Sequence, residues 1–128
     1  MPANPLMAYE NVSKAAMSGR ELEAAVLTKA AQRLKRCQDT WNEEGAGEKL
    51  DEALRYNQKL WTHFQGQLTD PENPLPPLIK QNLLNLSVFV DRRTFELMAD
   101  PSAEKLTPLI NINQIGRASC RERECHRV

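Results

Sequence analysis

Two cysteines and a histidine near the C-terminus are the first residues whose types could support chemistry. Cys120 and Cys125 are separated by four residues, and His126 follows directly. Thiolate and imidazole groups are common zinc ligands, but structural zinc sites usually pair them more closely, as in C-x2-C, and need a second pair elsewhere. The sequence has no such second pair. We therefore expect no metal ion and no other cofactor.

The remaining histidine and cysteine do not suggest catalysis either. His63 stands between Trp61 and Phe64, and the sequence places no nucleophile and no orienting carboxylate beside it. A catalytic histidine needs such a set within hydrogen-bond reach. Cys37 falls on an apolar helical position, so we expect a small core residue. These patterns predict a protein that is not an enzyme and has no small-molecule substrate.

Composition changes after residue 114. Residues 115–123 resemble the conceptual translation of a sequencing adapter, and we interpret 115–128 as a non-native, disordered tail that follows a single domain of residues 1–114. Four of the 17 basic and two of the 17 acidic residues lie in this tail, which leaves a net charge of −2 for the domain. One thiol remains there, which indicates a reducing compartment. An acidic balance does not favour nucleic-acid binding.

The N-terminus and the apolar segments indicate whether the protein is secreted or inserted into a membrane. Residues 1–5 show no positively charged region followed by an apolar run, so we predict no secretory signal. The longest apolar-rich run covers residues 83–90, far short of the roughly 20 residues that span a bilayer. We expect a cytoplasmic protein that does not enter a membrane.

Helical periodicity organises most of the chain. Ser18 and Glu21 have the spacing of a capping box, which predicts a helix start, and Gly45 to Gly47 predict its end. The apolar positions of this first helix are Leu22, Val26, Ala30, Leu34, Cys37 and Trp41. A second helix is expected at about 48–68, with Leu50, Leu54, Asn57, Leu60, Trp61, Phe64 and Leu68 on one face.

A third helix is expected at about 77–98, and it is apolar on two faces. One face holds Ile79, Leu83, Leu86 and Val90, and the other holds Leu84, Val88, Phe95 and Met98. Such a helix is either central or covered by a partner. A short piece at 103–106 then leads to Thr107 and Pro108, which predict a last helix. The fold class is all-α: a small bundle of three main helices plus a short or truncated C-terminal helix.

An ordered set of short motifs resembles the FlaF family of flagellar biosynthesis regulators over residues 7–114. The motifs are Ala8-Tyr9, Arg20-Glu21-Leu22-Glu23, Asn57-x-x-Leu60-Trp61, Asn73-Pro74-Leu75-Pro76, Leu86-Ser87-Val88-Phe89-Val90-Asp91-Arg92-Arg93-Thr94 and Pro108-Leu109-Ile110-Asn111-Ile112-Asn113. Phe89 stands where the family commonly has tryptophan, and Asn111 replaces an acidic residue. The resemblance implies a small helical regulator that binds flagellin as a secretion chaperone would, supports flagellin synthesis and filament assembly, and acts with FlbT.

The resemblance and the apolar third helix suggest where a partner binds. The candidate residues are Trp61, Phe64, Leu86, Phe89, Val90, Arg92 and Arg93. Core packing is the favoured alternative for Trp61 and Phe64, because a stripe at helical spacing is usually core. For the two arginines, a client contact and a solvated helix face remain open. Asn57 is expected to make an internal hydrogen bond, since buried amides mostly do.

A second function remains open at this point. The family's link to flagellin synthesis suggests post-transcriptional control of flagellin mRNA, either directly or as an adaptor for FlbT. Lys29, Arg33, Lys35 and Arg36 form the basic cluster that such a role would use. The chain lacks a basic stripe interleaved with aromatic residues, so direct RNA binding is the less favoured reading.

Overall fold

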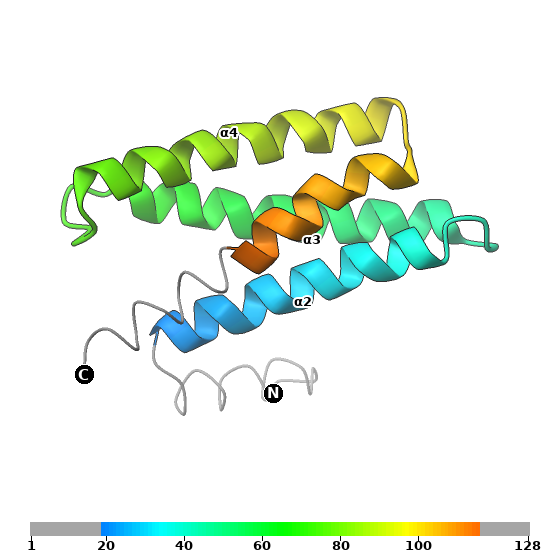
Figure 1. Ribbon diagram of the computed structural model, residues 1–128, viewed down its shortest axis with the longest axis horizontal. Coiled ribbons are helices and arrows are strands. Elements are labelled where there is room, and N and C mark those ends of the chain that lie inside the picture. Colours follow the sequence, from blue (N-terminus) through cyan, green and yellow to red (C-terminus); the bar gives the residue numbers. More distant parts are fainter. Residues whose placement is uncertain (1–18, 116–128) are drawn as a thin grey trace, which may run out of the picture.

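Three long helices and a short C-terminal helix make up the fold in the computed structural model, which describes residues 19–115 (Figure 1). The elements are α2 (Gly19–Asp39), α3 (Ala46–Leu68), α4 (Pro77–Ala99), the 3-10 helix η1 (Ala103–Leu106) and a C-terminal helix over residues 107–115. The described part contains no strand. The predicted all-α bundle of three main helices and a short C-terminal one is confirmed. Ser18, the expected capping residue, lies outside the described residues.

Helix α3 is the centre of the bundle. It packs on both α2 and α4, whereas within the described residues α2 and α4 do not pack on each other. The chain after α4 turns back and crosses between them (Figure 1). Leu106 and Leu109 on this returning segment are fully buried. The return of the chain therefore closes the core that the three long helices leave open.

Gln38 ties α2 to the start of the returning segment. Its Nε2 atom donates to the backbone oxygen of Ala103 at 2.9 Å and to the hydroxyl of Thr107, also at 2.9 Å. Thr107 begins the C-terminal helix without a break after η1. These bonds place the end of α2 beside the junction of the two short helices.

The first helix ends earlier than the sequence suggested. The expectation that it runs on to Gly45 is wrong: α2 ends at Asp39, and the turn that follows bonds three residues back, as from Glu43 N–H to the carbonyl of Thr40 at 3.0 Å. Gly45 instead precedes α3, with a φ of 79° that favours glycine. Trp41 therefore lies in the turn, where it packs against the core from outside the helix.

The buried face of α3 follows the predicted stripe, and that of α2 is wider than predicted. Leu50, Leu54, Asn57, Trp61 and Leu68 of α3 are buried as expected. On α2, the additional buried residues are Ala24, Leu27 and Ala31, whereas Val26 is only half-buried. This helix packs against η1 as well as α3, so its buried arc extends beyond a single stripe.

The inner face of α4 also differs from the predicted one. Of Ile79, Leu83, Leu86 and Val90, only Val90 is fully buried. The other buried residues are Ser87, Thr94 and Leu97. The two hydroxyls donate to carbonyls of their own helix, those of Leu84 and Val90, each at 2.7 Å, so their burial leaves no donor unpaired. Because η1 packs beside the C-terminal end of α4, burial is deepest there.

A buried polar network joins the C-terminal helix to α3. The indole Nε1 of Trp61 donates to Oδ1 of Asn113 at 2.9 Å, and Nδ2 of Asn113 donates to Oδ1 of Asn57 at 2.8 Å. Both asparagines are fully buried, and Trp61 is 3% exposed. Asn57 thus makes the internal hydrogen bond expected of it, although its Nδ2 has no partner within the described residues.

The network predicts that Asn113 is essential for stability. In Asn113→Ala, the indole N–H and the Asn57 carbonyl lose their partners inside the core, and each unpaired buried group costs about 1–3 kcal/mol. We expect the free energy of unfolding to fall by about 3 kcal/mol, measured by urea denaturation. Asn111→Ala is the matched control, because Asn111 is exposed on the same helix; its effect should stay within about 0.5 kcal/mol. Equal stability of the two variants would contradict a structural role of the network.

Candidate functional site

The outer surface of α4 carries a row of exposed apolar side chains. Val88, Phe95 and Met98 are 50%, 59% and 40% exposed, and the half-buried Leu84 continues the row toward the N-terminus. Their spacing of four, seven and three residues places them on one side of the helix. We call Leu84, Val88, Phe95 and Met98 the outer stripe.

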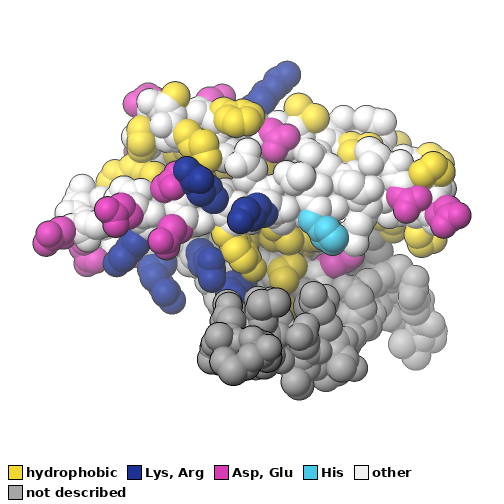
Figure 2. Space-filling view, turned by 180° about the vertical axis from the view of Figure 1, so that it is seen from behind, with side chains coloured by type: hydrophobic (Ala, Val, Ile, Leu, Met, Phe, Trp, Pro, Cys, Tyr) yellow, Lys and Arg dark blue, Asp and Glu magenta, His cyan; other side chains and the backbone are white. Residues whose placement is uncertain are grey.

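The outer stripe is left open by the packing of the bundle. Val90, Thr94 and Leu97 turn to the core, and Asp91 accepts a hydrogen bond from Gln65 Nε2 of α3 at 3.1 Å, which fixes how α4 is rotated on α3. Figure 2 shows hydrophobic side chains gathered over α4 along the upper edge of the molecule. Asp91 lies on the same side between Val88 and Phe95 and interrupts the row, but exposed apolar surface of this kind typically marks an interaction site.

The seven candidate residues from the sequence do not form one surface. Trp61 and Val90 are buried, so neither presents its side chain to a partner in this structure. Phe64 and Leu86 are half-buried and pack against the core. The ring of Phe64 stands edge-on to that of Trp61, with centroids 5.6 Å apart. The core alternative for Trp61 therefore agrees with its position.

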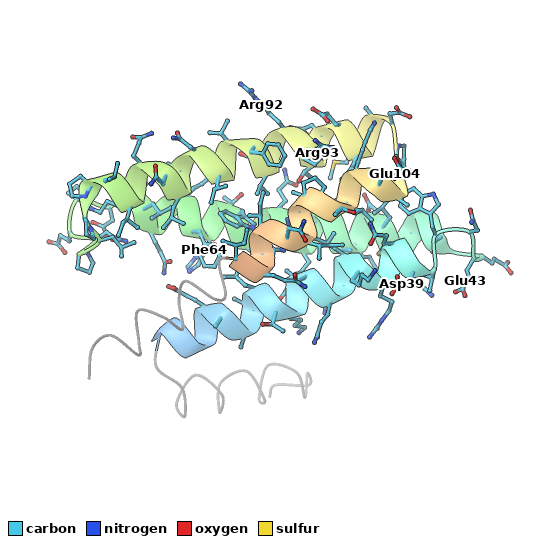
Figure 3. All side chains as sticks on the ribbon, in the orientation of Figure 1. Asp39, Glu43, Phe64, Arg92, Arg93 and Glu104 are labelled. Carbon is cyan, nitrogen blue, oxygen red and sulfur yellow. The ribbon has the colours of Figure 1, made fainter. Side chains whose placement is uncertain are left out.

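The other three candidates lie on α4 but off the outer stripe. Phe89 is 37% exposed, and the guanidinium carbon of Arg93 lies 5.4 Å from its ring centroid. Arg93 Nε is also 3.6 Å from Glu96 Oε2. Figure 3 shows Arg92 pointing away from the bundle and Arg93 toward it. Of the two arginines, Arg92 is the exposed one.

The sequence indicated the outer stripe as a second apolar face of the third helix. Val88, Phe95 and Met98 were nevertheless not among the predicted partner-binding residues. Their spacing was the available signal. What the spacing did not reveal is which of the two faces of α4 the bundle covers. The structure leaves Phe95 and Val88 more exposed than any of Trp61, Leu86 and Val90.

The basic cluster expected for RNA binding is largely engaged in contacts within the fold. Arg33 Cζ and Lys29 Nζ lie 4.3 Å and 5.7 Å from the ring centroid of Tyr56 on α3. Lys35 Nζ is 3.1 Å from Asp39. Two of the four cations thus brace α2 against α3.

Groups with catalytic or metal-binding potential are sparse in the described part. His63 is exposed, and residues 19–115 contain no cluster of three or more metal-ligating side chains. Cys120, Cys125 and His126 lie outside the described residues. None of the described helices has the length and apolar character needed to cross a membrane.

Comparison with protein families adds the decisive observation. The family model described as flagellar protein FlaF matches residues 5–118 of the chain. The chain belongs to the FlaF family. Searches among curated proteins and among solved structures give no match.

The family match covers every element of the bundle. It includes the outer stripe and the network of Asn57, Trp61 and Asn113. This FlaF-family match also runs four residues beyond the domain boundary predicted at residue 114. The division between a domain of residues 1–114 and a tail of 115–128 remains a prediction.

Cys37 illustrates how the core affects the one thiol of the described part. Burial raises the pKa of the Cys37 thiol, and the nearby charges of Lys49 and Arg36 oppose this shift in part. A raised pKa favours the neutral thiol in the folded state. Its contribution to stability is therefore fully present below the unfolded pKa of about 8.5 and is lost as pH rises through the folded value.

We predict that Cys37 reacts slowly with thiol reagents while the protein is folded. In a Cys120→Ser, Cys125→Ser background, the rate with a disulfide reagent at pH 8 should be roughly tenfold or more lower than in the urea-unfolded chain, because buried neutral thiols are poor nucleophiles. Stability should also decline above pH 9 more steeply than in the same background with Cys37→Ala. Equal rates in the folded and unfolded states would contradict this assignment.

Proposed function

We propose that this FlaF-family protein binds flagellin in the cytoplasm, as a secretion chaperone would, and thereby supports flagellin synthesis and filament assembly. The observation that carries the proposal is the outer stripe of α4. A soluble chain that keeps Val88, Phe95 and Met98 in water gains free energy when a partner covers them. Family membership supplies the flagellar context.

The shape of the outer stripe suits a helical client. Apolar residues in a row along one helix can accept the apolar face of a second amphipathic helix, which is a common mode of peptide recognition. Phe95 is its most exposed member, at 59%, and aromatic residues contribute much of the binding energy at such interfaces. We therefore propose the terminal helices of flagellin as the segments that bind.

In this role the protein is a binding regulator and not an enzyme. An adaptor role toward FlbT uses the same kind of surface and is the second candidate partner. Direct action on flagellin mRNA has weaker support, because Lys29 and Arg33 lie over Tyr56 and Lys35 pairs with Asp39.

Phe95→Ser tests the proposal. Because Phe95 is largely exposed, we expect little change in stability, within about 0.5 kcal/mol. Affinity for monomeric flagellin, measured by isothermal titration calorimetry, should fall roughly tenfold or more because an aromatic contact is lost.

Leu78→Ser is the matched control. Leu78 lies on the same helix and is 73% exposed, but it is outside the outer stripe. This variant should bind flagellin within about twofold of the parent protein, since most residues away from an interface centre contribute little. Absence of flagellin binding at micromolar concentration would reject the proposal. Binding to FlbT alone, lost in Phe95→Ser, would support the adaptor role instead.

A further inference from the structure

A hollow of about 340 Å³ opens where α3 begins and α4 ends. Its walls are largely apolar and come from Trp41 in the turn, Leu50 and Leu54 of α3, and Leu97 and Met98 of α4. The volume lies within the range of about 300–1,000 Å³ typical of ligand pockets. It is therefore large enough to admit a bulky apolar side chain.

Met98 connects this hollow to the outer stripe. It is the C-terminal member of the stripe and also lines the hollow. A helix that lies along α4 over Val88 and Phe95 thus reaches the hollow at one end. In this respect the inference rests on the proposed function, because it assigns the hollow to the same helical partner.

Acidic residues are concentrated at the end of the bundle where the hollow opens, and we call them the acidic rim; Asp51 among them lines the hollow itself. Segments 39–55 and 96–105 carry nine acidic residues and only three basic ones. The acidic residues are Asp39, Glu43, Glu44, Glu48, Asp51, Glu52, Glu96, Asp100 and Glu104. Figure 3 shows Asp39, Glu43 and Glu104 at this end of the bundle, and Figure 2 shows several acidic side chains there with basic ones beside them.

Ion pairs within the fold account for fewer than half of these charges. Within the described residues, Asp39, Asp51, Glu96 and Asp100 each have a basic partner at 2.8–3.6 Å. The remaining five have none in that part of the chain. Glu48 lies in the first turn of α3, where a negative charge favours the helix. Helix stability offers no comparable reason for Glu43 and Glu44, which lie in the turn before it.

We propose that the hollow accepts one apolar side chain of the partner helix, and that Lys or Arg residues flanking that side chain meet the acidic rim. The apolar contact supplies affinity, and the charges select the partner and speed its approach. A second copy of this chain is a poorer occupant, because its own acidic end would meet like charge. The hollow is therefore assigned to a basic, amphipathic helix.

Two synthetic helical peptides of about 20 residues, a length typical of longer globular helices, provide the probe. Both carry the same leucine and phenylalanine positions, flanked by lysine in one peptide and by glutamate in the other. Binding to the full chain is measured by fluorescence anisotropy. The lysine peptide should bind roughly tenfold or more tightly than the glutamate peptide, and added salt should reduce the difference.

Gly47→Leu tests the hollow itself. Gly47 lines the hollow, and an added Cβ atom meets nothing within 4 Å, so a side chain can be added at this wall without a clash at its first atom. Leucine also suits a helix better than glycine, so the variant should fold. Affinity for the lysine peptide should fall roughly tenfold, because burial of one apolar side chain is lost.

Gly66→Leu is the matched control, since Gly66 lies on the same helix with open space around it and does not line the hollow. It should bind the lysine peptide within about twofold of the parent protein. The inference would be overturned by equal affinity for both peptides or by no binding of either. It would also be overturned if Gly47→Leu left binding unchanged or if Gly66→Leu caused an equal loss.

Binding of flagellin that still depends on Phe95 would then leave the proposed function standing. The expected peptide pattern without any flagellin binding would reject the proposed partner but not the hollow.

Discussion

The hydrogen bonds among Asn57, Asn113 and Trp61 are the constraint on which the arrangement of this small bundle depends. Three polar side chains lie inside a core that is otherwise built mainly of leucine and alanine, and two hydrogen bonds join them there. A polar group buried without a partner is costly, so the position of Asn113 against α3 is specified far more narrowly than apolar packing alone would specify it. One turn separates Asn57 from Trp61, and both reach the same asparagine. The C-terminal helix thereby has a defined register on α3.

This anchored helix determines what the long helices can present to solvent. It covers the space between α2 and α4, and η1 packs against both of them. The inner face of α4 packs on α3 and, at its C-terminal end, on η1, and the hydroxyls of Ser87 and Thr94 bond to carbonyls of their own helix. Val88, Phe95 and Met98 on a second face of the same helix stay exposed. The outer stripe and the hollow beside Met98 are the result, and they are the surfaces to which a partner helix is assigned.

Trp61 and the end of α2 show what residue spacing could and could not predict. Trp61 lies on a clear helical stripe, and both its core position and the chain's helical fold could be predicted from spacing. Its hydrogen bond to Asn113, 52 residues away, could not, because local periodicity carries no information about which polar groups meet. The end of α2 also differs from the prediction: glycine at 45 signals a helix boundary, but it precedes α3, whereas α2 already ends at Asp39 and a turn follows.

For residues 19–115, the sequence by itself determined the number of long helices, most of their boundaries and the buried face of α3, and it also indicated the family to which the chain belongs. These follow from short-range features, namely periodicity, turn residues and an ordered set of motifs. Only the tertiary structure decided which of the two apolar faces of α4 remains open, and that Phe95 and Val88 are exposed while Val90 is covered. The physical reason is that burial depends on neighbours supplied by distant segments. For α4, those neighbours are α3, whose Gln65 bonds to Asp91, and η1 at the C-terminal end of the helix.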